Sequence, residues 1–542
     1  MPFLGILEDN KLPHVPGTVI LEEAAAHSGE ITGGLKHGTG RNANVVLIPQ
    51  PSDDPNDPLN WPQWKKLMVL SVTLSGSVLY AAVCSAMLNP AFFQISVELN
   101  TTIAALISAT GYQTLVVGVT GPIFSALGRK YGKRPIFLWA SLVCLVGNIV
   151  GSAQYSYNGI LISRILQGFA IAPYESLIFA LISDLFFVHE RGIYTAVINF
   201  VLAGISNLTG VVSGPIATNL GWQWIYHLCV ILGALQTIAQ YFFAPETSYV
   251  RDRRYEIDER INDDLEGLAE LEHKREINAT HQEETGEKAV SASTTENRLA
   301  ATTSTTPPPP KKTFRQELAI FNGTFSRENL FQLFIAPFAV VTNLAVSWVV
   351  LVPSMFVTLY VVIAFVMAQV FAPPPYLLSP TAIGLLSLVV LPQEQRRLRA
   401  RIPAFASWLG LVAGAGLLGW GTMVADGISP VACAAVHGIT LFGIIGICIA
   451  TNAYIIDAYR AMTAEVFIAN MAVKNLMIYG FSYFVNDWTA KVGVKHAFHV
   501  WGGVALAITA TTPVLYFWGK RYRSFWARKN LLAKMGIVTH EE

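Results

Sequence analysis

The chain has 542 residues, of which 52% are hydrophobic and only 13% are charged, and its formal net charge is +1. Soluble domains carry about twice that charged fraction, and the small net charge gives no sign of a nucleic-acid partner or of an acidic partner. Runs of about 20 apolar residues recur instead, each long enough to cross about 30 Å of hydrocarbon. The composition therefore predicts an all-α, polytopic membrane protein.

Twelve transmembrane helices are expected, in two six-helix bundles. Pro337, Pro353 and the prolines at 373–375 interrupt the stretch 330–392, so helix ends are poorly defined there. The expected spans are 67–88, 103–125, 135–153, 159–183, 194–216, 223–244, 330–352, 376–391, 402–424, 430–457, 464–485 and 497–518.

These spans divide the chain into five parts. We expect an N-terminal cytoplasmic tail, an N-terminal bundle, a cytoplasmic central loop, a C-terminal bundle and a cytoplasmic tail, at 1–66, 67–244, 245–329, 330–518 and 519–542. The central loop holds a charged stretch at 254–277, which suits a surface helix, and a low-complexity stretch at 301–313. Such a sequence favours a largely disordered tether, with a regulatory segment as the alternative.

Lysine and arginine set the orientation. The loop after the second span carries four cations, and four more follow the eighth span: Arg129, Lys130, Lys133, Arg134, Arg396, Arg397, Arg399 and Arg401. Both termini and the central loop are therefore predicted to be cytoplasmic, and the plasma membrane is the expected location.

Several kinds of site are not expected. The five cysteines lie within apolar runs without metal-ligand spacing, so they are predicted to be packing residues and no metal or cofactor is expected. The sequence has no phosphate-binding loop and no nucleophile elbow. Energy for any transport would then come from an ion gradient, and the protein is not expected to be an enzyme.

The fourth span, 159–183, contains Arg164 and Glu175. A charge at a helix centre costs about 2.5–3.5 kcal/mol to insert and is a functional-site hypothesis by default. Eleven helical residues make three turns plus about 20°, so the two charges share one face, about 16 Å apart, with Gly168 close to it. We expect a polar stripe facing a cavity, in which Glu175 carries a proton or pairs with a cationic substrate group. The alternative is that both residues form packing ion pairs with other helices.

Four stretches carry a family resemblance: DPLNWPQWKK at 57–66, SALGRKYGKRP at 125–135, SRILQGFAIA at 163–172 and GVVSGPIATNLGWQW at 210–224. In them the chain resembles the major facilitator superfamily, and within it the fungal drug:proton-antiporter-like group. The resemblance implies a gating loop at Lys130, Gly132, Lys133 and Arg134. Ser125 and Arg129 replace the glycine and the aspartate that are usual there, and a simple positive-inside loop is the alternative reading.

The resemblance also extends to the fourth and fifth spans. Arg164, Gln167, Gly168 and Ala172 match the fourth-span motif, which implies that Arg164 serves proton coupling. Gly210, Gly214 and Pro215 match the antiporter-associated motif of the fifth span and imply a close helix contact. Thr218 and Asn219 stand where that motif has glycines, so the direction of transport is not implied.

The second half offers fewer signals. Asn452, Lys474 and Asn475 are polar residues within apolar spans, and the stretch from Lys474 resembles the eleventh span of the family. The residues expected to serve proton coupling or to line the substrate path are Arg164, Gln167, Glu175, Asn452, Lys474 and Asn475. Lys474 either snorkels to the interface or lines the substrate path. His227 and His437 are expected to be packed or interfacial, with a proton relay as the alternative.

The resemblance implies a monomeric, proton-coupled transporter that moves a small organic molecule, cationic or amphipathic, by alternating access. A transport-inactive or sensing relative is one alternative, and a membrane acyltransferase using His437 is another. The eighth span, 376–391, would measure about 24 Å against about 30 Å of hydrocarbon, so it is predicted to be truncated.

Overall fold

The computed structural model describes residues 47, 49, 51–52, 54–250, 310–326, 328–374, 376–385, 402–458 and 462–529. The predicted surface helix at 254–277 and the basic cluster at 396–401 lie outside these residues. All the regular elements of the described chain are helices, which confirms the all-α prediction.

The helices of the first half begin with a segment that changes its winding. α2, Gln63–Ser77, continues into the π-helical η4, Val78–Val83, and the short α3, Cys84–Ala86. The 3-10 helix η3, Pro58–Asn60, precedes this segment. After it come η5 Asn89–Ala91, α4 Phe92–Glu98, α5 Ile103–Tyr131, α6 Arg134–Ala153, α7 Tyr157–Leu185, α8 Val188–Leu220 and α9 Gln223–Phe243. These bounds agree closely with the six spans expected before residue 245.

The second half departs from the prediction at two places. The expected span 330–352 is broken, because Asn343 accepts hydrogen bonds from the backbone N–H groups of Ala345 and Val346 and so caps a new helix. The expected span 497–518 breaks at 510–511, just before Pro513, which suits the first turn of a helix. The helices are α11 Phe314–Glu317, α12 Leu330–Val340, α13 Leu344–Phe371, α14 Pro380–Leu385, α15 Ile402–Ala425, α16 Pro430–Ala458, α17 Thr463–Val492, α18 Val494–Thr509 and α19 Thr512–Lys529.

Nine helices among the described residues are long and apolar enough to cross a membrane. Helices α8 and α17, with 33 and 30 residues, are also long enough to cross a membrane but are not among those nine. The predicted eighth span is described only as far as Leu385, where it forms the six-residue helix α14. The rest of that span lies outside the described residues, so its truncation stays a prediction.

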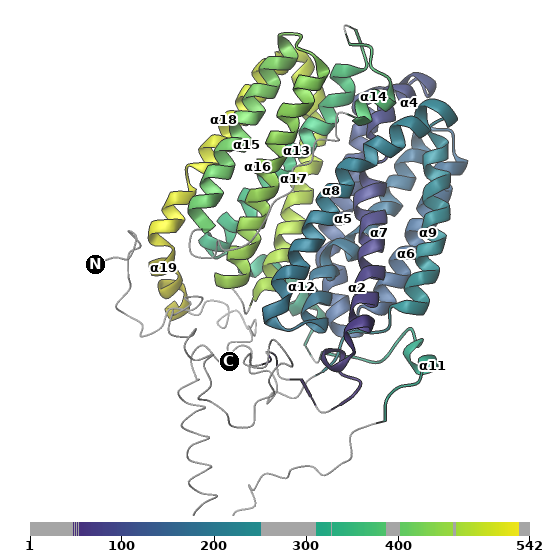
Figure 1. Ribbon diagram of the computed structural model, residues 1–542, viewed down its shortest axis with the longest axis vertical. Coiled ribbons are helices and arrows are strands. Elements are labelled where there is room, and N and C mark those ends of the chain that lie inside the picture. Colours follow the sequence, from purple (N-terminus) through teal and green to yellow (C-terminus); the bar gives the residue numbers. More distant parts are fainter. Residues whose placement is uncertain are drawn as a thin grey trace, which may run out of the picture.

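Two groups of helices lean against each other (Figure 1), one from α2 to α9 and the other from α13 to α19. Helix α5 of the first group packs along α17 of the second, and α8 packs along α14. The end that carries α11 is at the bottom of Figure 1, and we call it the lower end; it is the predicted cytoplasmic end. The end that carries α4 and α14 is the upper end.

Candidate functional site

A cavity of about 390 Å³ lies between the two groups of helices. Its wall draws on both: Ala82, Ser85, Gln113 and Glu175 come from the first, and Tyr360, Asn452, Lys474 and Asn475 from the second. Most of the remaining wall is apolar, with Ile171, Phe179, Leu441, Ile444 and Ile478 among its side chains. Four of the residues predicted for the substrate path therefore line one cavity: Glu175, Asn452, Lys474 and Asn475.

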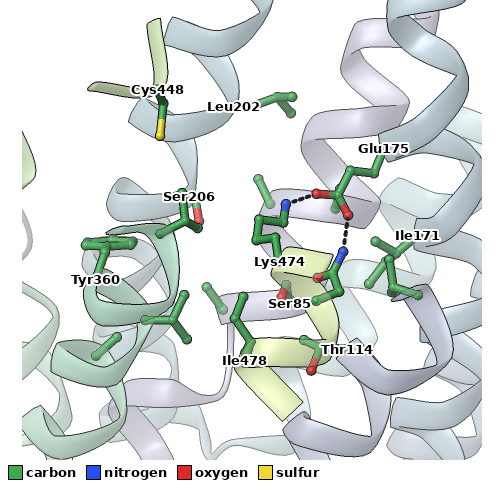
Figure 2. A pocket seen from close by; sticks show the side chains of 18 of the residues that line it. Ser85, Thr114, Ile171, Glu175, Leu202, Ser206, Tyr360, Cys448, Lys474 and Ile478 are labelled. Atoms are coloured by element: carbon green, nitrogen blue, oxygen red, sulfur yellow. Dashed lines mark hydrogen bonds and ion pairs between the residues drawn. The ribbon is translucent and has the colours of Figure 1, made fainter. Parts of the chain in front are cut away.

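Glu175 is bound from the opposite half of the molecule. Its Oε1 forms an ion pair with the Nζ of Lys474, and the Nδ2 of Asn475 donates to its Oε2 over 3.1 Å. Figure 2 shows Lys474 reaching toward Glu175 at the cavity wall. The side chains of Glu175 and Lys474 are 19% and 22% exposed. The acid in the middle of α7 is thus paired, and its partner is Lys474 rather than Arg164.

Arg164 lies apart from this pair, in a polar cluster inside the first half. It is fully buried, and its Nη1 donates to the carbonyl oxygens of Cys84 over 2.5 Å and of Ser85 over 3.4 Å. The same nitrogen donates to the amide oxygens of Gln113 and Gln167, at 3.2 and 3.4 Å. No hydrogen bond or ion pair among the described residues joins Arg164 to Glu175, although the two share a helix.

The break at the end of the first helix explains how a buried guanidinium is tolerated without a carboxylate. Helix α3 ends at Ala86, and the last carbonyls of a helix have no partner within it. Two such carbonyls, of Cys84 and Ser85, accept from Arg164. The negative end of the helix dipole adds to the stabilisation of the cation.

The polar cluster continues through two more amides. The Nε2 of Gln113 donates to the Oε1 of Gln167 over 3.1 Å, and the Nε2 of Gln167 donates to the Oδ1 of Asn148 over 2.7 Å. Gln167 was predicted as a path residue, but it lies in this cluster and is fully buried. Gln113 lines the cavity, so it connects Arg164 to the cavity wall.

The predicted gating loop is held by the chain segments around it. The backbone carbonyl oxygen of Lys130 accepts from the backbone N–H of Phe325 over 2.8 Å. The guanidinium of Arg134 donates to the carbonyl oxygens of Tyr241, Ala244 and Leu318. Lys133 forms an ion pair with Asp184. Gly132 has a φ of +94°, and a β-carbon there would lie 2.3 Å from Glu246, so a glycine is needed at this turn.

Arg129, which replaces the usual aspartate, forms an ion pair of its own. Its Nη1 lies 2.5 Å from Oε1 of Glu465, the third residue of α17. Because α5 and α17 belong to different halves, this pair joins the two halves at the lower end. The side chains are 27% and 13% exposed, so the pair is partly shielded from solvent.

The predicted packing residues lie at close helix contacts. A β-carbon at Gly168 would come within 2.6 Å of the carbonyl oxygen of Gln113, and one at Gly214 within 2.5 Å of that of Pro380. Gly214 thus belongs to the contact of α8 with α14, where Thr218 also shares a hydrogen bond with Thr381. Pro215 is the next residue of α8. Gly210 lines the cavity.

The two histidines considered for proton relay are not among the cavity-lining residues. His227 packs against Trp224, with ring centroids 5.4 Å apart, and His437 stacks on Tyr360 at 5.9 Å. His437 is 2% exposed. The acyltransferase alternative, which depended on His437 facing a cavity, gains no support from this position.

Several residues of these sites were not identified from the sequence. Gln113 and Asn148 are polar residues in the middle of predicted spans, and that placement alone was a signal for them. Glu465 could be found only by knowing that the start of α17 meets the end of α5. Glu246 accepts from the backbone N–H groups of Lys133 and Arg134, at 3.0 Å each, and so caps α6 from a distant segment.

Residues 74–485 match the family model of the Major Facilitator Superfamily. An uncharacterised MFS-type transporter of Schizosaccharomyces pombe is 28% identical over 256 residues, which are 46% of this chain and 42% of that protein. The efflux pump dotC of Dothistroma septosporum is 25% identical over 33% of this chain and 30% of its own length. The MFS antiporter QDR3 of Candida albicans is 26% identical over 39% and 30%. The chain thus spans less than half the length of these curated relatives.

Two solved structures share the fold. The human organic anion transporter MFSD10 (TETRAN) matches 83% of this chain and 100% of its own, with a TM-score of 0.54 and 13% identity. A D-xylose–proton symporter matches 82% and 97%, with a TM-score of 0.52 and 13% identity. With a family match that covers most of the chain and a bundle of this shape, the protein belongs to the Major Facilitator Superfamily.

Proposed function

We propose that this protein is a secondary active transporter that moves a small organic molecule across a membrane, coupled to protons, by alternating access. The observation that carries the proposal is the ion pair between Glu175 and Lys474, which joins the two halves at the wall of a cavity that both of them line. Transporters of this kind bind substrate between two halves that rock around the site.

A purely structural role explains the pair less well. An ion pair that is removed from water recovers little net stability, because the desolvation cost offsets the Coulomb attraction. A site that must release and re-form its contacts in each cycle needs such a balanced interaction. The proton would reside on Glu175, and the loss of its charge would weaken the contact between the halves.

We also propose a gate at the lower end. The ion pair of Arg129 with Glu465 holds the ends of α5 and α17 together there. The charges are reversed with respect to the family pattern, since the arginine stands where an aspartate is usual. In this proposal the lower end is cytoplasmic, because the loop 129–134 carries four cations. The plasma membrane is the proposed location, and the unit is a monomer.

The test is a flux assay with the purified chain in sealed vesicles under an imposed pH gradient, using a panel of small organic acids, bases and neutral compounds. We expect at least one compound to accumulate against its gradient, and the accumulation to vanish when an ionophore collapses the pH difference. Protein-free vesicles provide the background. Flux equal to that background for the whole panel would favour the transport-inactive alternative.

A further inference from the structure

We propose that the substrate of this cavity is an amphipathic organic anion, bound by Lys474, and that Glu175 takes up one proton when the anion binds. The inference rests on the proposed function, because it assigns the substrate class to the same site. It differs from the cationic substrate that the sequence suggested for Glu175.

The first observation is that the carboxylate is already satisfied. Glu175 accepts from both Lys474 and Asn475, so an incoming cation would meet an acid whose charge is neutralised. The Asn475 amide also donates to the carbonyl oxygen of Met471, and this second contact holds it in place. A cation would have to displace Lys474 and leave its ammonium without a carboxylate partner, which is costly.

The second observation concerns the balance of charge. Among the described bundle helices from α2 to α18, three charged side chains lie more than five residues from both helix ends: Arg164, Glu175 and Lys474. Two of them are cations and one is an acid. Arg164 is stabilised by carbonyl and amide oxygens and has no carboxylate partner among the described residues, so the middle of the bundle has an excess of positive charge. This excess of positive charge attracts an anion to the cavity and repels a cation.

Binding of the anion exchanges the ion-pair partner of Lys474. The anion pairs with the Nζ of Lys474, and the carboxylate of Glu175 loses its cation in a largely apolar cavity. An isolated buried carboxylate takes up a proton rather than stay charged. The amide N–H of Asn475 still donates to the carbonyl oxygen of the neutral acid. The ion pair is thus replaced by a Lys474–anion pair and a neutral Glu175, with one proton and one negative charge added and no change in net charge.

The wall also indicates the body of the substrate. Ile171, Phe179, Ile444 and Ile478 present apolar surface, so the anion should carry an apolar body. The Oδ1 of Asn452 is buried and has no hydrogen-bond partner in the described structure. A hydroxyl or amine on the substrate can donate to it, which adds a second point of recognition.

Three probes of nearly the same shape test the proposal: 2-naphthoate, 2-naphthamide and 2-naphthylmethylammonium. Each is titrated calorimetrically into the purified full-length chain at neutral pH, in two buffers of different ionisation enthalpy, which counts the protons exchanged. We expect naphthoate to bind about tenfold or more tightly than the neutral amide, with uptake of about one proton per molecule bound.

Variants separate the roles of the two residues. Lys474→Met should remove the preference for naphthoate, whereas Lys495→Met, at a lysine paired with Asp426 over 3.6 Å outside the cavity, should not. Glu175→Gln should retain or strengthen naphthoate binding but abolish proton uptake, and this arm does not depend on how well the lysine variant folds.

Two results would overturn the proposal: naphthoate binding no tighter than naphthamide, or the ammonium probe binding best with release of a proton. The flux assay gives an independent answer on function. Proton-linked binding of the anion without any flux would refute transport and support the anion site. Gradient-driven flux of cations alone would support transport and refute the anion site.

Discussion

Glu175 is the residue on which the account of coupling depends. It carries the negative charge of an inter-half ion pair, and glutamine keeps its shape and its contact with Asn475 but cannot hold the charge or a transferable proton. We expect Glu175→Gln to abolish gradient-driven accumulation while leaving the amount of protein in the membrane near normal. Accumulation assays with quantified expression check this.

Two further variants make the test of Glu175 specific. Glu98→Gln changes an acid at the upper end that accepts from Trp222 and Gln223, outside the cavity, and should leave accumulation intact. Exchanging the two charges, with Glu175→Lys and Lys474→Glu together, should restore a pair but not coupling. Normal, pH-driven accumulation in Glu175→Gln or in the exchanged pair would show that the ion pair is only structural.

Arg164 gives a second prediction at the residue scale. All four of its hydrogen bonds come from Nη1, which donates to two carbonyl oxygens and two amide oxygens. A lysine keeps the positive charge but not the planar guanidinium, and an alanine keeps neither. We expect Arg164→Ala to lower the transport rate about tenfold or more, since each lost hydrogen bond to a charged group is worth about 1.5–3 kcal/mol. Arg164→Lys should be impaired less. Initial rates measured at matched expression decide it, and equal rates for all three proteins would make Arg164 a packing residue.

At the scale of elements, the contact between α5 and α17 at the lower end predicts a charge-reversal result. Arg129→Glu places two acids together, and Glu465→Arg places two cations together. Each variant alone should therefore weaken the gate and lower the thermal stability. The double variant restores a pair with opposite polarity. We expect a coupling energy of about 0.5–3 kcal/mol from the double-mutant cycle.

The double-mutant cycle is followed by thermal unfolding of the purified protein in detergent and by transport rate. Lys65→Glu is a matched control, because it reverses a charge in another ion pair, with Glu317, which lies at the lower end. That variant should not be rescued by Glu465→Arg. Strictly additive effects of Arg129→Glu and Glu465→Arg would mean that the contact does not hold the gate.

At the scale of the whole molecule, apolar run length predicted most of the helices, because a membrane requires helices of a fixed length. It failed where a local signal interrupts an apolar run: the cap at Asn343 and the break before Pro513 both lie inside stretches that hydropathy joins together. The candidate site was also predictable only in part.

The sequence identified Arg164, Glu175 and Lys474, because a charge within an apolar span is costly in hydrocarbon.

Which of these charges pair could not be predicted from the sequence. Helical periodicity places Arg164 and Glu175 on one face of α7, yet Glu175 pairs with a residue about 300 positions away in the chain, on α17. Only the packing of the two halves brings them together. The same holds for Arg129 with Glu465, where the sequence showed an arginine in place of the usual aspartate but not the acid in the other half with which this arginine pairs.

The central claim is that the two halves move about the Glu175–Lys474 pair, and distance measurements between spin labels test it without a known substrate. In a background lacking the native cysteines, one label pair spans the halves at the lower end, Phe243 with Phe525, and another at the upper end, Tyr155 with Val431, all at exposed positions. A third pair within the first half, Tyr155 with Phe243, serves as the control. We predict that acidification or Glu175→Gln changes the two inter-half distances in opposite directions and leaves the control distance unchanged. Inter-half distances that stay fixed, or that change in the same direction, would contradict the account.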